Sequence, residues 1–218
     1  MLYVYGDSHG YYSFFGLKVP HKNMARPLIT MYRVGRDKEI LEFDASEHNE
    51  QSILCFVYGE IDCRCHIHKQ ILRGRNEDDI IRELVTNYMG ALQQTIQDHM
   101  RIIVVGVIPP TTRSEYEGVH GSLVESERQY IHGVDKQNLV PFLGTEAERV
   151  RYTTKVNALL EELCATHGYI YFNPYAYYTR ADGTFTYELS DRWVHLGNNE
   201  VFLDAFMKLY ARIFTEGL

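Results

Sequence analysis

A serine stands directly after the first apolar segment of the chain, within residues 6–10 (GDSHG). Residues 2–5 have the composition of a short buried strand, which Gly6 ends. In a parallel sheet, ligands bind beyond the carboxyl ends of the strands. Ser8 therefore lies where its hydroxyl could act as a nucleophile. A turn in which Ser8 caps a helix is the plainer interpretation of the same residues.

A second group of reactive side chains lies at residues 63–68 (CRCHIH), which offer four thiol or imidazole groups in six residues. With Cys55 they could form a zinc site, but the spacing is not that of a zinc finger and no second ligand pair follows. We therefore predict no metal site and no cofactor. We expect Asp62, Arg64 and His66 to form a polar network under the crevice that carries Arg64 towards the substrate. The chain has four cysteines, which we predict to be reduced thiols: Cys55, Cys63, Cys65 and Cys164.

Apolar segments alternate with amphipathic ones along the whole chain. Strands are predicted at residues 2–5, 28–34, 52–58, 101–108 and 168–172, and helices at 78–99, 145–166 and 199–215. This alternation predicts an α/β fold, a three-layer α/β/α sandwich in which a five-stranded parallel sheet carries helices on both faces. Residues 1–218 are predicted to form one domain, with an excursion at about 111–144 and a hairpin at about 177–189.

The order of the motifs resembles that of a known family. Residues 6–10 match G-x-S-x-G, the nucleophile elbow of α/β-hydrolases, but that elbow needs earlier strands and only one precedes Ser8. With Gly-Asp-Ser after the first strand, the chain instead resembles the SGNH (GDSL-like) hydrolases. Their third block, G-x-N-D, corresponds to residues 59–62 (GEID), and their final Asp and His correspond to Asp191 and His195. The resemblance covers nearly the whole chain and implies a flavodoxin-like topology.

The resemblance also implies a role for each residue of a catalytic triad. Ser8 would be the nucleophile, His195 the base and then the acid, and Asp191 the group that orients His195. The family places its Asp three residues before its His, whereas Asp191 stands four residues before His195. One bulged residue would restore the family's geometry. Alternatively, Asp191 only caps a turn and a backbone carbonyl orients His195. His9 adjoins Ser8, and because sequence neighbours rarely face each other, we place His9 in the pocket wall.

One part of the family's oxyanion hole is missing from this sequence. Ile61 stands where the family has an asparagine that donates a hydrogen bond. The remaining donors would be the backbone N–H groups of the nucleophile and of Gly35, which follows the second predicted strand. Arg64 lies two residues beyond Asp62, and we expect its guanidinium to supply the missing donor. The competing interpretation pairs Arg64 with Asp62 or Glu60 as a structural ion pair.

Composition excludes several classes of function. The formal net charge of −7 over 218 residues disfavours binding to a nucleic-acid backbone. No apolar run approaches the length of a membrane span, and residues 2–5 are too short for the apolar core of a secretion signal. We therefore expect a cytoplasmic protein without a membrane or nucleic-acid partner. The oligomeric state is left open.

The aromatic residues bear on the substrate. Tyrosine occurs 17 times, against 10 phenylalanines and one tryptophan, and its ring with a polar tip suits a polar ligand. We predict a serine esterase that removes a short acyl group, acetyl first, from a carbohydrate. There are two alternatives. One is acyl transfer to a sugar hydroxyl, and the other is a non-catalytic binding domain, which Ile61 favours. The aromatic residues expected at the crevice, of which at least half should belong to the core, are Tyr11, Tyr12, Phe14, Phe15, Tyr175, Tyr177, Tyr178 and Trp193.

Overall fold

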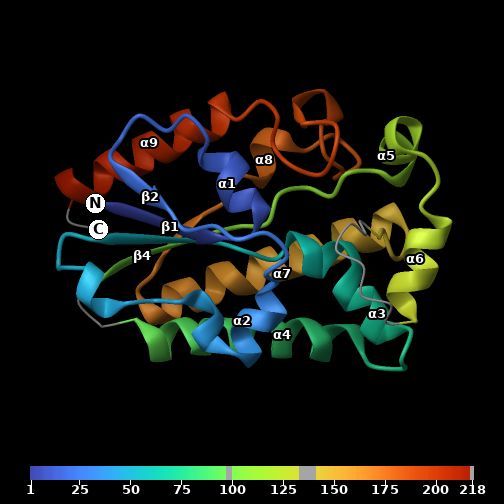
Figure 1. Ribbon diagram of the computed structural model, residues 1–218, viewed down its shortest axis with the longest axis horizontal. Helices are drawn as coiled ribbons and strands as arrows, with labels where there is room; N and C mark the ends of the chain where they lie inside the picture. The colour runs from blue at the N-terminus through green and yellow to red at the C-terminus, as the bar shows by residue number, and fades with distance from the viewer. Residues whose placement is uncertain (97–99, 133–140, 217–218) are drawn as a thin grey trace.

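The centre of the fold is a parallel sheet of five strands in the order β2-β1-β3-β4-β5 (Figure 1). The computed structural model describes residues 1–96, 100–132 and 141–216. Each neighbouring pair of strands is parallel, so the predicted sheet and its flavodoxin-like order are both confirmed. In chain order the strands are β1 (Leu2–Gly6), β2 (His21–Asn23), β3 (Ile53–Val57), β4 (Arg101–Val105) and β5 (Ile170–Phe172).

Helices cover both faces of this sheet, as predicted (Figure 1). Alternate residues of each strand face opposite layers: Val4 and Cys55 belong to one core cluster, whereas Tyr5 and Phe56 belong to the other. The first layer contains α1 (Ser8–Phe14) and α9 (Glu200–Thr215). The second layer contains α2 (Met31–Arg36), α4 (Glu77–Thr95) and α7 (Glu146–His167).

The long helices begin where the sequence places their capping residues. The Thr145 hydroxyl accepts a hydrogen bond from the Glu148 N–H at 3.2 Å, and the Glu148 carboxylate accepts one from the Thr145 N–H at 2.7 Å. This is the capping box that opens α7. The Asn76 side chain accepts the N–H groups at the start of α4 in the same way. The predicted helices at 145–166 and 199–215 agree with α7 and α9, and α4 matches the third except at residues 97–99, which lie outside the described residues.

The second strand predicted at residues 28–34 is wrong. Strand β2 comes earlier, and Met31–Arg36 forms α2, whose first turn is capped by the Thr30 side chain. The three residues of β2 are polar and lie at the edge of the sheet, so the strand carries no apolar pattern. The apolar residues of the misassigned segment are buried on the α4 side of the molecule instead, as Ile29, Met31 and Val34.

The excursion at residues 111–144 contains two helices, α5 (Arg113–His120) and α6 (Val124–Ile131), and its residues 133–140 lie outside the described part of the chain. A small core of its own joins this excursion to Val194, and consists of Tyr116, Leu123 and Phe142 around that valine. The predicted hairpin is a tight turn at residues 180–184 with one bridge, between Thr179 and Phe185. Short elements complete the fold: α3 (Ile67–Ile71), α8 (Tyr175–Tyr178), a π-helical turn (Asp62–His66) and 3₁₀ turns at Lys38–Leu41, Ala45–Glu47 and Tyr187–Leu189.

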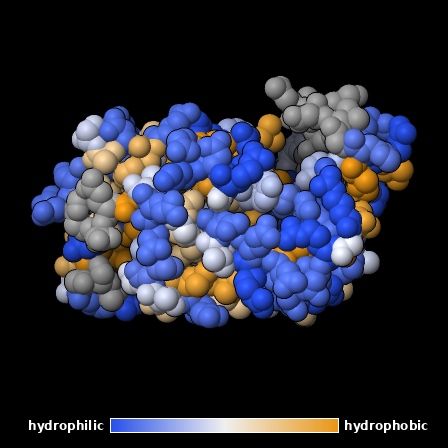
Figure 2. Space-filling model, turned by 90° about the horizontal axis from the view of Figure 1, so that it is seen from below, coloured by the Kyte–Doolittle hydropathy of each residue, from blue (hydrophilic) through white to orange (hydrophobic). Residues whose placement is uncertain are grey.

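The surface on the α4 side is mainly hydrophilic, with small and separate hydrophobic spots (Figure 2). Within the described residues, no helix has both the length and the apolar character needed to cross a membrane. Most of the buried apolar side chains belong to the two core clusters, one on each face of the sheet.

Two glycines allow a matched test of how α2 packs on α4. A Cβ added at Gly35 would lie 2.8 Å from the backbone nitrogen of Tyr88, whereas one added at Gly90 of α4 meets nothing within 4 Å. We expect Gly35→Ala to lower the free energy of unfolding by about 1–3 kcal/mol, because the two helices must move apart. Gly90→Ala should raise it by roughly 0.5–1 kcal/mol, because alanine favours the helix. Urea denaturation measures both, and equal midpoints would contradict this account of the α2–α4 contact.

Candidate active site

Ser8, His195 and Asp191 form one hydrogen-bonded chain, although Ser8 and His195 are 187 residues apart in sequence. Ser8 Oγ lies 2.9 Å from His195 Nε2, and His195 Nδ1 lies 2.7 Å from Asp191 Oδ2. The side chains of His195 and Asp191 are 15% and 18% exposed, so a ligand can reach them. A hydroxyl, a base within hydrogen-bond distance and a carboxylate that orients the base are the parts of an activated nucleophile.

The sequence between β1 and α1 positions the serine. A Cβ at Gly6 would lie 2.8 Å from the Val57 carbonyl oxygen, so only glycine allows β1 to end this close to β3. Asp7 Oδ1 accepts a hydrogen bond from the His9 N–H at 2.8 Å and caps α1. Ser8 is the first residue of that helix, so its N–H has no acceptor within the first turn. The Gly-Asp-Ser sequence thus places both the hydroxyl and a free N–H beyond the carboxyl end of β1.

The loop that carries Asp191 and His195 accommodates the extra residue between them. Arg192 adopts a left-handed conformation with φ of +65°, which a residue other than glycine rarely does. Asp191 Oδ1 accepts the N–H groups of Trp193 at 2.8 Å and of His195 at 3.2 Å, while Oδ2 faces the imidazole. Asp191 therefore caps the turn and orients His195 at once. Burial acts to raise the pKa of Asp191, but the hydrogen bonds from His195 and the backbone outweigh it and the pKa is lowered.

The excursion supports this loop from outside. His120 at the end of α5 has its Nε2 2.7 Å from the Arg192 carbonyl oxygen, and its ring centre lies 4.0 Å from that of Trp193. Val194 is buried among the side chains of the excursion's own core. None of these contacts has a local sequence signal, because each joins residues that are far apart in the sequence, such as His120 and Arg192, which are 72 positions apart.

An aromatic groove of about 420 Å³ opens beside the triad. The ring of Tyr12 stacks on that of His195, with the ring centres 4.3 Å apart and the planes at 16°. Tyr11 and Phe15, at 49% and 65% exposure, form the outer wall of the groove. Other aromatic residues expected here have different positions: Phe14 and Tyr178 are buried in the core, and Tyr175 donates its hydroxyl to the Gly183 carbonyl.

Arg64 does not reach the triad. Its Nε donates to Glu60 Oε1 at 2.8 Å, and one of its terminal nitrogens donates to the Pro141 carbonyl at 2.9 Å. The side chains of Arg64 and Glu60 are both more than nine-tenths buried. Glu60 Oε2 in turn lies 3.2 Å from His9 Nε2, and the His9 ring packs 4.8 Å from that of His195. The expectation that Arg64 is an oxyanion donor is wrong, because its guanidinium is held by Glu60 behind the triad. The competing interpretation, a structural ion pair with Glu60, agrees with the structure.

Burial and charge pairing shift the pKa values in this row of buried groups. Burial would raise the pKa of Glu60, but Arg64 and His9 outweigh it and lower the pKa to about 2. Burial lowers the pKa of His9, which favours the neutral ring in spite of Glu60. His9 is thus buried behind Ser8, where it contacts both Glu60 and His195, and it does not line the aromatic groove.

Asp62 and Gly35 both stabilise α2 and its packing, and neither takes part in the hydrogen-bonded chain of Ser8. The Asp62 carboxylate accepts the N–H groups of Met31 at 2.7 Å and Tyr32 at 3.3 Å, so it caps α2. Burial raises the pKa of Asp62 to about 7, against the effect of these hydrogen bonds. Gly35 lies inside α2 against α4, which makes the expected role of its N–H in the oxyanion hole wrong. The expectation failed because it assumed a strand where the chain forms α2.

The cysteine and histidine residues at 63–68 do not gather around one point. All four cysteines are buried free thiols, and burial raises the pKa of each. Among the described residues, no group of three or more His, Cys, Asp or Glu side chains could hold a metal ion. Cys65 Sγ bonds to the Ile61 carbonyl oxygen, whereas the ring of His66 packs on Tyr32.

Comparisons with known proteins bear on the fold. No family model matches the sequence, and no curated protein matches it. Among solved structures, the chain is similar to a protein from Streptococcus pneumonia provisionally described as a platelet activating factor, with a TM-score of 0.60, 15% identity and coverage of 95% of this chain and 80% of that one. It is also similar to a GDSL-like lipase from Bacteroides thetaiotaomicron, with a TM-score of 0.54, 10% identity and coverage of 100% and 88%.

A third similar structure is phospholipase A1 from Streptomyces albidoflavus, with a TM-score of 0.54, 13% identity and coverage of 95% of this chain and 98% of that one. The similarity extends over nearly the full length of each of these chains. The protein therefore has the fold of the SGNH (GDSL-like) hydrolases, as the order of its motifs predicted, and it is a divergent example of that fold.

The low pKa of Glu60 leads to a prediction for stability in acid. A carboxyl whose pKa is lower in the folded state stabilises the fold above its unfolded pKa and loses that effect as the pH falls towards the folded pKa. Glu60→Gln should lower the free energy of unfolding by about 3–5 kcal/mol near pH 7, because Arg64 is left uncompensated. The difference from the parent protein should shrink between about pH 5 and pH 2.

The control is Asp204→Asn, which removes an exposed pair with Lys208 and should cost less than about 1 kcal/mol. Urea denaturation across this pH range measures all three proteins. A Glu60→Gln difference that stays constant down to about pH 2 would show that the ionised Glu60 is not what stabilises this region.

Proposed function

We propose that the protein is a serine esterase that hydrolyses a short acyl ester through Ser8, His195 and Asp191. The observation that carries the proposal is the hydrogen-bonded chain from Ser8 Oγ through the His195 ring to Asp191, with distances of 2.9 and 2.7 Å. The shared fold with a GDSL-like lipase and a phospholipase A1 supports it. This assignment needs no metal and no cofactor.

The geometry fits a two-step reaction. In the first step, Ser8 Oγ attacks the ester carbonyl carbon while its proton passes to His195 Nε2. The C–O bond of the ester then breaks, and the departing alcohol takes the proton from the imidazolium. In the second step, water attacks the acyl carbon while its proton passes to His195 Nε2. The bond between that carbon and Ser8 Oγ then breaks, the imidazolium returns the proton to Ser8 Oγ, and the carboxylic acid leaves. Asp191 stabilises the imidazolium through Nδ1–H in both steps.

The negative charge that develops on the carbonyl oxygen needs hydrogen-bond donors. The Ser8 N–H at the start of α1 is the donor that this structure supports. Ile61 has no donor to add, and Arg64 is held by Glu60. The loss of one side-chain donor costs about 10²–10³ in turnover, so we expect a slow esterase compared with an enzyme that has the asparagine.

The groove supports a carbohydrate as the group that carries the ester. Its walls are exposed aromatic rings next to Asp191, and the flat faces of such rings pack well against the C–H faces of a sugar. Asn199 at the edge of the groove is already bonded to the carbonyls at the end of α1, which fixes that edge. We therefore propose an acetylated saccharide as the substrate class.

The first test removes the nucleophile. Ser8→Ala should abolish hydrolysis of p-nitrophenyl acetate and prevent covalent labelling by a fluorophosphonate, because no other hydroxyl within residues 1–96, 100–132 and 141–216 is paired with His195. Hydrolysis is followed by absorbance and labelling by intact-protein mass spectrometry. Ser46→Ala, at an exposed serine that bonds to Asp44, is the control and should keep both properties.

The circular dichroism spectrum of Ser8→Ala must match that of the parent protein, which shows that the variant is folded. Retained turnover or retained labelling in correctly folded Ser8→Ala would overturn the assignment of Ser8. Absence of labelling in the parent protein itself would favour a non-catalytic binding domain.

The second test addresses the carbohydrate. Tyr11→Ala should raise KM for an acetylated pyranoside about 3- to 10-fold and change KM for p-nitrophenyl acetate less, because only the sugar extends along the outer wall of the groove. Tyr177→Ala removes a tyrosine of similar exposure, 47% against 49%, that does not line the groove, and it should change neither value. Equal effects of the two substitutions would contradict a sugar-binding role for the groove.

A further inference from the structure

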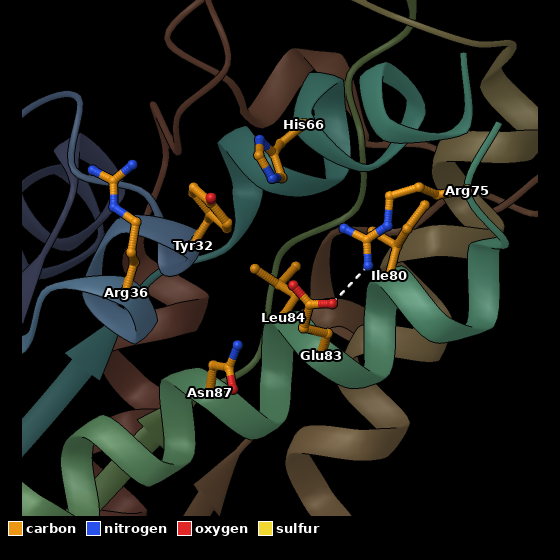
Figure 3. A pocket seen from close by; sticks show the side chains of 8 residues that line it. All are labelled: Tyr32, Arg36, His66, Arg75, Ile80, Glu83, Leu84 and Asn87. Carbon is orange, nitrogen blue, oxygen red and sulfur yellow. Dashed lines mark hydrogen bonds and ion pairs between the residues drawn. The ribbon is translucent and has the colours of Figure 1, made fainter. Parts of the chain in front are cut away.

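A second pocket, of about 150 Å³, lies in the layer opposite to α1 (Figure 3). Its walls come from α2, the π-helical turn, the segment before α4, and α4 itself. It shares no lining residue with the aromatic groove beside the triad. Ile80 and Leu84 of α4 form its apolar floor, and polar side chains surround it.

Three of the six polar side chains that line this pocket are basic: Arg36, His66 and Arg75. Figure 3 shows Arg36 and Arg75 on opposite sides of the space and His66 above it. The one carboxylate of the lining, Glu83, is paired with Arg75 at 2.6 Å. A basic pocket is notable in a chain whose formal net charge is −7.

Two of these basic groups have hydrogen-bonding capacity to spare. Among the described residues, Arg36 pairs with no carboxylate, and its guanidinium lies 5.5 Å from the ring centre of Tyr32. The His66 side chain likewise has no hydrogen-bond partner within the described ranges, and its ring packs at a tilt of 31° against the same tyrosine, with the ring centres 4.4 Å apart. The Tyr32 ring therefore lies between a guanidinium and an imidazole, each with nitrogens available (Figure 3).

The electrostatic surroundings of His66 favour an anion. Burial lowers the pKa of His66 to about 4, and the charges of Lys69, Arg73 and Arg75 add to this effect, with only Glu83 opposing it. With this pKa the His66 ring is neutral at pH 7. The cationic side chains near it would be balanced by an anion that enters the pocket. The pocket thus combines two exposed arginines with a partly buried imidazole.

We propose that this pocket binds the phosphate group of a small molecule. A tetrahedral phosphate presents oxygens in several directions, which suits donors that approach from α2, the π-helical turn and the segment before α4. A planar carboxylate would occupy one guanidinium fork and leave the others unused. The apolar floor leaves room for the carbon atoms that bear the phosphate. This inference is independent of the esterase proposal, because it uses none of the residues of the triad.

The experiment titrates inorganic phosphate into the full chain at low ionic strength and about pH 7. Calorimetry should show saturable binding of one phosphate per chain, and proton NMR of the His66 ring should show that bound phosphate raises the pKa of His66, because the anion stabilises the imidazolium. His66→Gln identifies the ring signal. Arg36→Gln should weaken binding about tenfold or more, since a charged hydrogen bond is lost. Acetate, as the planar anion, should bind about tenfold more weakly than phosphate.

Arg33→Gln is the matched control, because Arg33 is an exposed arginine of the same helix that does not line the pocket. It should leave phosphate affinity unchanged. Equal weakening by Arg33→Gln and Arg36→Gln would show diffuse attraction to a basic surface and overturn the proposal, as would a His66 ring whose pKa does not respond to phosphate. Acetate affinity equal to that of phosphate would overturn the assignment of the ligand class.

Discussion

The buried ion pair between Glu60 and Arg64 is the interaction on which the surroundings of Ser8 depend. Burying two charges costs several kcal/mol each, and the pair is tolerated because the charges compensate each other and Arg64 makes a second hydrogen bond. Arg64 reaches the Pro141 carbonyl as well as Glu60, and the second oxygen of Glu60 faces His9. His9 then packs against His195. One pair of charges therefore joins the end of β3, the start of α1 and the far end of the excursion.

The π-helical turn that carries Arg64 explains why the cysteine and histidine side chains at residues 63–68 share no common centre. Its wider turn directs consecutive side chains to different parts of the protein. Asp62 caps α2, Cys63 lies in the core, Arg64 holds Glu60 and His66 lines the second pocket. Potential ligands that are close in sequence thus end far from a common centre. The same turn connects the back of the candidate active site with the wall of the second pocket.

The sequence was sufficient for features that depend on chain order or on a repeating apolar pattern. The sheet, the long helices and the carboxyl-end position of Ser8 are of this kind, because buried strands and capped helices leave strong local signals. The short edge strand β2 and the position of Gly35 were missed, since three polar residues carry no such signal. The ion pair of Arg64 was recognisable as an alternative from its i, i+4 spacing to Glu60, but the choice depended on where that turn points. The contact of His120 with Arg192 was beyond prediction, because only the folded chain brings these residues together.

The alignment of the triad finally rests on a strained residue that the excursion holds in place. A left-handed conformation at a non-glycine residue costs about 1–2 kcal/mol, and Arg192 adopts it in the turn between Asp191 and His195. Such a conformation persists only where its surroundings determine it more strongly than the strain opposes it. Here the Arg192 carbonyl lies against His120 and also accepts the Tyr187 hydroxyl, while Val194 is buried in the small core of the excursion. The excursion is therefore part of what keeps Asp191 and His195 in line with Ser8, although it contributes no residue to the hydrogen-bonded chain itself.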